Sequence, residues 1–306
     1  MMLLERNFRN TKGRYIVEIR VLRYFLVVAR EGSITGASKV LHISQPALSK
    51  QLKDLENELG TRLYVRTNYR IRLTEAGRLL RRRSEDILSL TDKTLDEFRT
   101  WNDLTGGDIR LGCAESCHIR FLTDALKAFR NDHPGLRIHI TSGDTMLTTE
   151  RLERGLLDFG IIVEPPDLSK YNYVKLPAAD TWGLVMLSTD PLAKKEKVRF
   201  EDLCGIPLFA SPQSIRADFP RWCGEGLDRL HFAGTVNLFY NGSVCVKSGL
   251  GCLLTFEYLA DVSPESGLCF RPLDPPLRSQ LYLIWKKYQV FSPIAELFLR
   301  SLSLDK

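Results

Sequence analysis

Hydrogen-bonding and basic side chains gather on one side of a helix that the sequence predicts from Ser44 onward. At about 100° per residue, that side carries Gln45, Pro46, Ser49, Lys50 and Lys53. Glutamine can bond adenine through two hydrogen bonds, lysine can reach guanine or a phosphate, and serine can bond either kind of group. These residue types indicate a helix N-terminus that enters a DNA major groove. The alternative is an ordinary solvated helix face.

The opposite side of this helix must be buried, because it is a stripe of Leu48, Leu52, Leu55 and Leu59. Two helices are expected before it. The first has an apolar face of Leu22, Phe25, Leu26 and Ala29, and the second has one of Ala37, Val40 and Leu41. Ser44 can cap the third helix, and Pro46 falls in its first turn, where a missing N–H costs nothing. Three short helices with a tight turn at His42-Ile43 predict a helix-turn-helix.

A basic β-hairpin is expected directly after these helices. Residues 63–73 are predicted to form two short strands around a turn at Thr67-Asn68-Tyr69. The hairpin carries Arg62, Arg66, Arg70 and Arg72. A hairpin of this kind beside a recognition helix is a wing, which can contact phosphates or the minor groove. The alternative is a charged surface hairpin.

Basic residues are concentrated in the first part of the chain. Residues 1–83 hold 18 Lys and Arg against 7 Asp and Glu, whereas residues 84–306 hold 25 against 30. The formal net charge of +6 therefore divides into +11 and −5. A basic head on a slightly acidic body favours a nucleic-acid-binding unit, and the alternative is a chance imbalance on a solvated surface. The length of 306 residues predicts about two domains.

Several classes of protein are excluded by composition. No stretch approaches the ~18 apolar residues that a membrane-spanning helix needs. Charged residues interrupt residues 1–14, so no secretory signal is predicted. Seven scattered cysteines favour a reducing compartment over a disulfide scaffold. We therefore expect a cytoplasmic chain with no membrane partner.

Five motifs in the head are typical of one family. They are Glu18-Ile-Arg-Val-Leu-Arg-Tyr-Phe, Gly32-Ser-Ile-Thr-Gly-Ala-Ser, Ser44-Gln-Pro-Ala-Leu-Ser-Lys-Gln-Leu, Leu55-Glu-Asn-Glu-Leu-Gly and Leu73-Thr-Glu-Ala-Gly. From about residue 18 to 78 the chain resembles the LysR-type transcriptional regulators without a gap. The resemblance implies a winged helix-turn-helix DNA-binding domain over 17–77. It also implies DNA contacts from Thr35, Gln45, Pro46, Ser49, Lys50, Lys53, Arg66, Arg70 and Arg72.

Two positions depart from the family pattern. Lys50 stands where arginine is common, which loses the planar guanidinium fork. The wing tip Asn68-Tyr69 lacks the usual glycine and an extra basic residue. Both departures bear on sequence preference rather than on DNA binding itself. Residues 1–16 precede the family's usual start, and either an over-extended start or a basic arm that touches DNA would explain them.

A long helix is expected from Thr74 to about Asp103, with the linker proper over 78–105. About 28 residues would extend ~42 Å at 1.5 Å per residue. Its apolar residues are too many to bury against the head alone, so we expect it to pair with the same helix of a second chain. Packing on its own C-terminal domain is the alternative. A hinge is predicted at Gly106-Gly107.

The body from residue 108 onward is predicted to be α/β with mostly parallel strands. Strands are expected near Ile109–Leu111, Ile138–Thr141, Phe159–Val163, Trp182–Leu187, Leu208–Ala210, Val236, Cys252–Thr255 and Leu281–Trp285. Helices are expected over His118–Asn131, Met146–Arg154, Ser214–Glu225, Ser243–Lys247 and Pro293–Leu302. Crossovers near 173–177 and 271–276 would divide the body into subdomain I (108–177 and 272–306) and subdomain II (178–271).

The body also resembles the effector domain of the same family, more patchily than the head does. The matching segments are Leu157-Asp-Phe-Gly-Ile, Asp190-Pro-Leu-Ala, Phe200-Glu-Asp-Leu-Cys-Gly-Ile-Pro-Leu and Lys247-Ser-Gly-Leu-Gly-Cys. That domain is similar to type 2 periplasmic binding proteins, which have two subdomains and a cleft. The resemblance therefore implies a two-subdomain α/β effector-binding domain over 108–306.

A small-molecule site is expected where strands end and helices begin. The loops so placed are 114–118, 142–145, 211–214 and 241–243. The effector contacts predicted on them are Ser116, Cys117, His118, Thr145, Ser211, Gln213 and Ser243. Helix N-termini favour a small carboxylate or phosphate, although Glu115 favours a ligand that also carries an amine. Simple N-capping is the alternative for each Ser and Thr.

Other chemistry is weakly indicated. Cys113, Cys117 and His118 lie close in sequence, but no second Cys/His pair has ligand spacing, so no metal site is predicted. Cys204 and Cys223 could form a redox switch, and burial as structural cysteines is the favoured interpretation. No phosphate-binding loop, nucleophile elbow or metalloprotease helix is present, so the chain is predicted not to be an enzyme.

The sequence predicts a DNA-binding transcriptional regulator whose action a small-molecule effector modulates. Its expected partners are double-stranded operator DNA, a second copy in a homodimer and further copies in a tetramer, the effector, and RNA polymerase when it activates. No cofactor is expected. The alternatives are a redox-switched regulator that uses cysteine pairs, or a small-molecule-binding protein or enzyme with an accessory DNA-binding domain.

Overall fold

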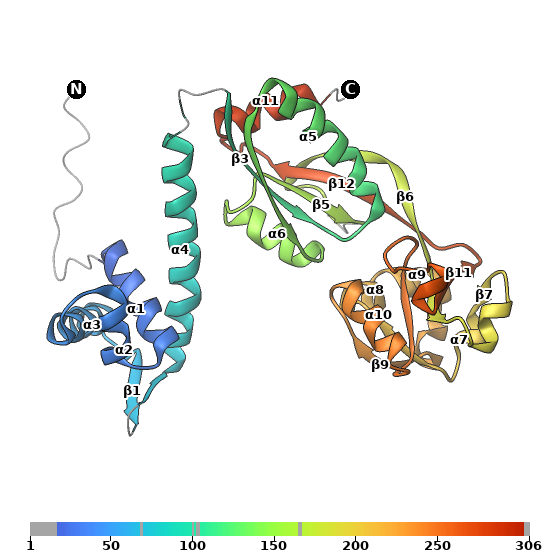
Figure 1. Ribbon diagram of the computed structural model, residues 1–306, viewed down its shortest axis with the longest axis horizontal. Helices are drawn as coiled ribbons and strands as arrows, with labels where there is room; N and C mark the ends of the chain where they lie inside the picture. Colours follow the sequence, from blue (N-terminus) through green and yellow to red (C-terminus); the bar gives the residue numbers. More distant parts are fainter. Residues whose placement is uncertain (1–16, 68–69, 100, 102–104, 165–166, 303–306) are drawn as a thin grey trace. The chain divides into compact units, whose positions relative to one another are not determined.

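The computed structural model describes residues 17–67, 70–99, 101, 105–164 and 167–302. The chain forms two compact units, one ending at Leu95 and the other beginning at Asp96 (Figure 1). The N-terminal extension 1–16 and the wing tip at 68–69 lie outside the described residues, so the expectations about them stay predictions. Within the described residues, no helix is both long and apolar enough to cross a membrane.

The first unit is a winged helix-turn-helix. Its helices are α1 (Ile19–Glu31), α2 (Ile34–Leu41) and α3 (Gln45–Leu59), and its wing pairs β1 (Tyr64–Thr67) with β2 (Arg70–Leu73) antiparallel. The residues predicted to end the first helix and to cap the third are confirmed. Gly32 ends α1 with a left-handed backbone, φ 62°. The hydroxyl of Ser44 caps α3 by accepting a hydrogen bond from the N–H of Ala47 over 3.3 Å.

The core of this unit gathers one side of each helix around Phe25. Its fully or nearly fully buried members are Val21, Phe25, Val28, Ile34, Ala37, Leu48, Leu52, Leu55 and Leu63. The predicted burial of two residues is wrong, because Val40 is 46% exposed and Leu59 is 37% exposed. Leu59 is the last residue of α3, where the helix has run past the neighbours that bury Leu48 to Leu55.

Helix α4 (Glu75–Arg99) follows the wing and continues past the boundary between the units. The hydroxyl of Thr74 accepts a hydrogen bond from the N–H of Gly77 over 3.0 Å and so starts the helix. Large apolar side chains remain exposed along it, namely Leu79, Ile87, Leu90, Leu95 and Phe98. Within a single chain, therefore, much of the apolar surface of α4 faces solvent.

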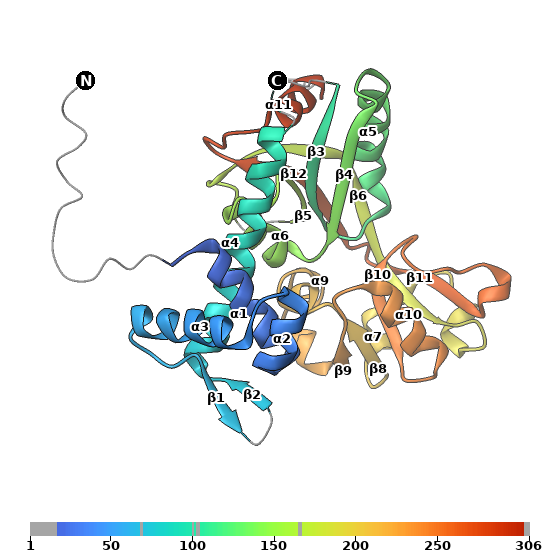
Figure 2. The same cartoon turned by 60° about the vertical axis from the view of Figure 1, so that its left-hand side comes forward.

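The second unit is built on a mixed sheet in the order β4-β3-β5-β12-β6-β10-β8-β9, with β11 paired to β6 and β7 (Figure 2). The strands are β3 (Gly106–Cys113), β4 (Gly135–Ser142), β5 (Phe159–Val163), β6 (Tyr171–Leu187), β7 (Val198–Arg199), β8 (Pro207–Ala210), β9 (His231–Thr235), β10 (Cys252–Phe256), β11 (Leu268–Asp274) and β12 (Arg278–Lys286). The α-helices are α5 (Arg120–Asp132), α6 (Thr145–Glu153), α7 (Phe200–Leu203), α8 (Pro212–Arg216), α9 (Asp218–Cys223), α10 (Phe239–Lys247) and α11 (Pro293–Ser301).

Strand β6 connects the two halves of this unit. Its first part pairs antiparallel with β12, from Tyr171 opposite Lys286 to Thr181 opposite Arg278. From Trp182 onward it pairs instead with β10 and β11. The two halves therefore share one continuous strand, and the chain passes between them a second time between β11 and β12.

Several expected elements of the body need correction. Most neighbouring strands are parallel, as predicted, but β6 and β12 run antiparallel to their neighbours in the middle of the sheet. Gly106-Gly107 is no hinge but the buried start of β3, paired with β4. The helix expected over Ser214–Glu225 is broken at Ala217 into α8 and α9. Val236 follows β9 instead of lying in it.

Candidate DNA interface and effector cleft

The predicted reading face of α3 is open to solvent. Gln45, Pro46, Lys50 and Lys53 are exposed, and Ser49 is partly buried. The wing residues Arg66, Arg70 and Arg72 are exposed as well. Within the described residues, the lysine and arginine side chains of this set form no ion pair with an acidic group. Their charges are therefore available to an external anion such as a phosphate.

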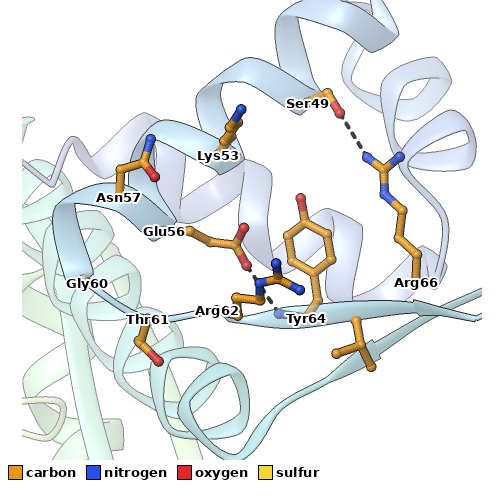
Figure 3. A pocket seen from close by; sticks show the side chains of 10 residues that line it. Ser49, Lys53, Glu56, Asn57, Gly60, Thr61, Arg62, Tyr64 and Arg66 are labelled. Carbon is orange, nitrogen blue, oxygen red and sulfur yellow. Dashed lines mark hydrogen bonds between the residues drawn. The ribbon is translucent and has the colours of Figure 1, made fainter.

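A side-chain hydrogen bond joins the middle of the wing to the recognition helix. The guanidinium of Arg66 in β1 donates to the hydroxyl of Ser49 in α3 over 3.0 Å (Figure 3). This contact brings two predicted DNA-binding residues together although they are far apart in sequence. The bond occupies one acceptor position of Ser49 and one N–H donor of Arg66. The other N–H donors of the Arg66 guanidinium stay available for a partner.

Two hollows flank this contact. A hollow of about 980 Å³ lies between the C-terminal part of α3 and the start of the wing, with Ser49, Lys53, Arg62 and Arg66 in its lining (Figure 3). Another, of about 350 Å³, is lined by Ser33, Ile34, Thr35, Gln45, Arg66, Thr67, Arg70 and Ile71. Six of the nine predicted DNA-binding residues therefore line one continuous surface that passes over Arg66.

Glu56 has a role in this surface that sequence reasoning missed. Its carboxylate accepts a hydrogen bond from the N–H of Leu63 over 2.7 Å and lies 3.5 Å from the N–H of Tyr64. Glu56 thus holds the start of the wing against α3. Burial, together with this carboxylate, raises the pKa of Tyr64 above its ordinary value. No local signal singles out Glu56, because Asp54 and Glu58 are acidic residues of the same helix.

In the second unit a small cavity of about 40 Å³ lies between the two halves. Ser211 and Gln213 are the predicted effector residues that line it. Its other lining residues are Ala114, Glu115, Gly143, Asp144, Val163, Trp182, Asp218, Asn237, Phe239 and Phe256. The neighbouring hollow of about 400 Å³ includes Thr145 and Gln213. The expected strand-end cleft therefore exists, with a lining that differs in part from the expected one.

The remaining predicted effector residues lie elsewhere. Ser116 is 5% exposed and caps the turn after β3 by accepting a hydrogen bond from the N–H of His118. Cys117 and His118 do not line either cavity. The prediction of a loop at Asn241–Ser243 is wrong, because α10 begins earlier, at Phe239. Ser243 is consequently inside the helix, where its hydroxyl donates to the carbonyl of Tyr240 over 2.7 Å.

Direct hydrogen bonds cross this cleft. The side-chain oxygen of Gln213 accepts from the N–H of Thr145 over 2.9 Å, and its amide donates to the Thr145 hydroxyl over 3.1 Å. The carboxylate of Glu115 accepts from the N–H of Phe239 over 2.7 Å. These contacts hold the two halves together, and they explain why the cavity has about the size of one water molecule.

A buried polar network forms one side of the cavity, and sequence reasoning did not identify it. The indole N–H of Trp182 donates to the Ser279 hydroxyl over 2.8 Å, and that hydroxyl donates to Asp218 over 2.6 Å. Arg221 donates to the same carboxylate over 2.8 Å. Burial raises the pKa of Asp218, and the hydrogen bonds from Ser279 and Arg221 oppose that shift.

The cavity lining is acidic. Glu115, Asp144 and Asp218 line it, and none of its described lining residues is a lysine or an arginine. The hollow beside it is more balanced, since it adds Lys170 and Arg216. The carboxylate groups disfavour a purely anionic ligand in the smaller cavity, because like charges repel strongly in a partly desolvated site.

The cysteines are all free thiols. Burial raises the pKa of Cys113 to about 12 and that of Cys252 to about 11. Burial also raises the pKa of Cys223, and the neighbouring Cys204 adds to that shift. Raised thiol pKa values leave little thiolate at neutral pH, which disfavours a reactive redox pair.

Comparison with known proteins agrees with this architecture. Residues 19–78 match the model of the bacterial regulatory helix-turn-helix protein, lysR family, and residues 102–304 match the LysR substrate binding domain. The chain is 27% identical over 284 residues to the uncharacterized HTH-type transcriptional regulator YbhD of Escherichia coli (strain K12), with 92% of this chain and 89% of the relative covered. It is 28% identical over 286 residues to the HTH-type transcriptional activator CmpR of Synechocystis sp., with 90% and 91% covered.

A solved structure shows the same fold. The crystal structure of CbnR, a LysR family transcriptional regulator, superposes with a TM-score of 0.73 at 21% sequence identity, covering 93% of this chain and 98% of that chain. The same neighbour is also described in complex with its target DNA. The helix-turn-helix, the two-part α/β body and both family models account for nearly the whole chain. The chain therefore belongs to the LysR family and is a LysR-type transcriptional regulator.

Proposed function

We propose that this regulator binds operator DNA through the surface that joins α3 to the wing, and that a small molecule in the cleft of the second unit modulates that binding. The observation that carries the proposal is the Arg66–Ser49 hydrogen bond, which sets helix and wing as one basic surface. Gln45, Ser49 and Lys50 lie on the helix for base edges, and the wing arginines lie beside them for phosphates.

Two copies are needed for a full operator. LysR heads of this kind read one half-site, and two-fold pairs of helix-turn-helix units read two. The exposed apolar residues of α4, Leu79, Ile87, Leu90, Leu95 and Phe98, supply a surface for a second copy of the same helix. Higher assembly into a tetramer and contact with RNA polymerase during activation belong to the same proposal.

The effector is a small polar molecule that carries an amine or other hydrogen-bond donors. Three lining carboxylates favour such a group, whereas Trp182, Phe239 and Phe256 offer apolar and aromatic contact. The molecule must displace the Gln213–Thr145 or Glu115–Phe239 hydrogen bonds in order to enter. Effector binding therefore changes how the two halves meet, which is the differential contact that allostery requires.

DNA binding is tested by removing positive charge from the proposed surface. We expect Lys50→Ala and Arg66→Ala each to weaken binding to a genomic target fragment by about tenfold, which corresponds to ~1.4 kcal/mol. Lys194→Ala removes one exposed charge from the second unit and should leave the affinity unchanged. Equal affinities for the wild type and both head variants would contradict the proposed surface.

The cleft is tested by a thermal-shift screen of small amines, amino acids and simple acids. A ligand that binds the native state raises the melting temperature in proportion to its saturation. We expect amine-bearing compounds to do so, and Glu115→Gln to weaken the response while DNA binding is kept. Stabilisation by simple acids alone, unaffected by Glu115→Gln, would contradict the proposed ligand class.

A further inference from the structure

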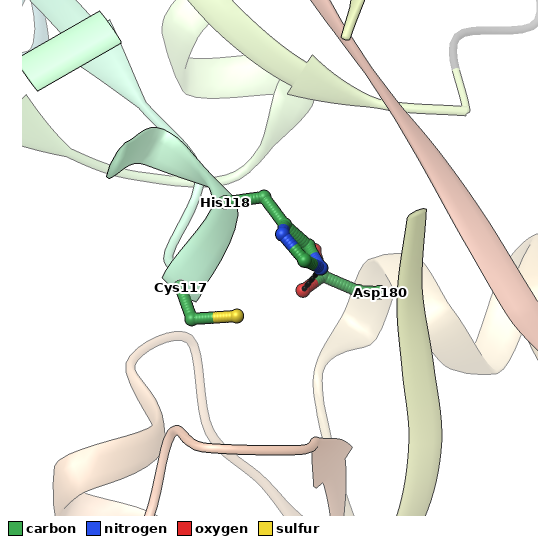
Figure 4. Close-up of side chains that lie close together, drawn as sticks. All are labelled: Cys117, His118 and Asp180. Atoms are coloured by element: carbon green, nitrogen blue, oxygen red, sulfur yellow. Dashed lines mark ion pairs between the residues drawn. The ribbon is translucent and has the colours of Figure 1, made fainter. Parts of the chain in front are cut away.

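A cluster of three metal-ligating side chains lies where the two halves of the second unit meet. The sulfur of Cys117, a ring nitrogen of His118 and a carboxylate oxygen of Asp180 all lie within 4.8 Å of one another. Figure 4 shows the thiol and the imidazole both turned toward the Asp180 carboxylate. The His118 Nε2 and Asp180 Oδ1 atoms lie 3.7 Å apart.

Asp180 is unusual among these residues because of its burial. It is 1% exposed, and although the Ser116 side chain interacts with its carboxylate, the Oδ2 atom has no hydrogen-bond partner within the described part of the chain. A buried carboxylate oxygen without a donor is costly, and most such oxygens in folded proteins are satisfied. The unpartnered oxygen belongs to the same carboxylate that faces Cys117 and His118, so a cation held there would satisfy it.

We propose that Cys117, His118 and Asp180 form a binding site for a zinc-like divalent cation. Thiolate, imidazole and carboxylate are the three donor types that Zn²⁺ uses, and three protein ligands with one open position are a common arrangement. Zinc–ligand bonds of ~2.0–2.3 Å in a tetrahedron separate the ligand atoms by about 3.5 Å. The ligand atoms therefore need to move by only about 1 Å, which side-chain rotation of Cys117 and His118 can supply.

A cation at this site would link two elements of the second unit. Cys117 and His118 lie in the short 3-10 helix Cys117–Ile119, directly after β3 in the first half. Asp180 lies on β6 opposite Ser279 of β12, two residues before the strand begins to pair with the second half at Trp182. A bound cation would tie the loop of the first half to the connecting strand at the point where the halves diverge.

Sequence spacing could not reveal this site. Cys117 and His118 are adjacent and offer only two ligands, and Asp180 is far along the chain. The fold supplies the third ligand, because β6 contacts the short helix Cys117–Ile119. The inference concerns a site separate from the effector cavity, since none of the three residues lines that cavity. It therefore stands independently of the proposed effector.

The test is a titration of the reduced full-length protein with Co²⁺, followed by displacement with Zn²⁺. We expect one equivalent of Co²⁺ to bind with a thiolate-to-cobalt charge-transfer band, which zinc removes. Cys117→Ser should abolish the band, and His118→Ala and Asp180→Asn should each weaken Co²⁺ binding by more than about tenfold, the lower bound even for residues that only support a ligand.

Matched variants make the result specific to these three side chains. Cys245→Ser and His231→Ala remove a partly exposed cysteine and an exposed histidine elsewhere in the second unit, and should bind Co²⁺ as the wild type does. Asp180→Asn can affect folding because it is buried, so the conclusion is drawn from Cys117→Ser and His118→Ala, with circular dichroism confirming their fold. Absence of a saturable band in the wild type, or its persistence in Cys117→Ser, overturns the proposal.

Discussion

The guanidinium of Arg66 in the wing donates a hydrogen bond to the hydroxyl of Ser49 in the recognition helix over 3.0 Å. Both side chains belong to the surface proposed to contact DNA, so one contact sets the position of a residue proposed to contact bases and of a residue proposed to bind phosphate. Glu56 supports the same arrangement at the start of the wing, where its carboxylate accepts a hydrogen bond from the N–H of Leu63. The relative placement of helix and wing is therefore defined before DNA binds.

Arg66 should be sensitive to the shape of its side chain as well as to its charge. Arg66→Lys keeps the charge but loses the planar fork that can bond Ser49 and a phosphate at once. We expect operator affinity to fall in the order wild type, Arg66→Lys, Arg66→Ala, with the alanine variant weaker by about tenfold. Fluorescence anisotropy with a fixed salt concentration measures this. A lysine variant as weak as the alanine variant would show that the fork, rather than the charge, is essential.

The salt dependence of binding should report each phosphate contact separately. Every lost phosphate contact reduces the slope of log K against log salt concentration by about 0.9. We expect Arg70→Ala and Arg72→Ala each to reduce the slope by that amount, and Lys194→Ala to leave it unchanged. An unchanged slope for both wing variants would place the wing away from the phosphates and limit DNA contact to α3.

Local signals in the sequence were sufficient to predict the head. Gly32, Ser44 and Pro46 act on their immediate neighbours, because capping and backbone preferences depend on residues within one helical turn. The strand predicted at Phe159–Val163 was confirmed for a similar reason, since all its residues are apolar and it lies inside the sheet. The family resemblance of the head rested on the same stretch.

Long-range pairing was not predictable in the same way. Strand β6 runs from Tyr171 to Leu187 because two different sets of partners, β12 and then β10, extend it in succession. Nothing local marks that change of partner. The Trp182–Ser279–Asp218 network and the cluster at Asp180 both depend on this strand, so neither could be found by inspecting residue spacing along the chain.

Gly77 should be intolerant of any side chain. A Cβ at this position would lie 1.9 Å from the carbonyl oxygen of Leu63, a backbone atom that also accepts the N–H of Thr74. We expect Gly77→Ala to lower the free energy of unfolding of the head by roughly 1–3 kcal/mol, as overpacked sites do. Gly36→Ala is the matched control, because its Cβ meets no atom closer than 3.6 Å. Similar denaturation midpoints for the two variants would contradict this account.

The buried network beside the cavity should contribute to the stability of the second unit. Ser279→Ala removes the acceptor of the Trp182 indole N–H and a donor to Asp218, and it leaves both groups buried. An unsatisfied buried polar group costs about 1–3 kcal/mol. We expect a loss in that range in urea denaturation, and a negligible change for the exposed control Ser169→Ala. Equal losses for the two serines would show that the network contributes nothing specific.

Asp108 should make the second unit sensitive to acid. Its hydrogen bond from Arg137 lowers its pKa to about 2 despite partial burial, and His139 contributes a further bond. Because the folded-state pKa lies below the ordinary value of 3.8, the carboxylate stabilises the fold above about pH 4. That stabilisation disappears as the pH falls through about 2. Since Arg137 is 63% exposed, solvent screening limits the stabilisation by Asp108 to about 1–2 kcal/mol.

Urea denaturation should show that Asp108→Asn is less stable than the wild type near neutral pH and that the difference shrinks in acid. The exposed Asp124→Asn should show no such trend. A difference that stayed constant with pH would trace the effect to packing instead of charge.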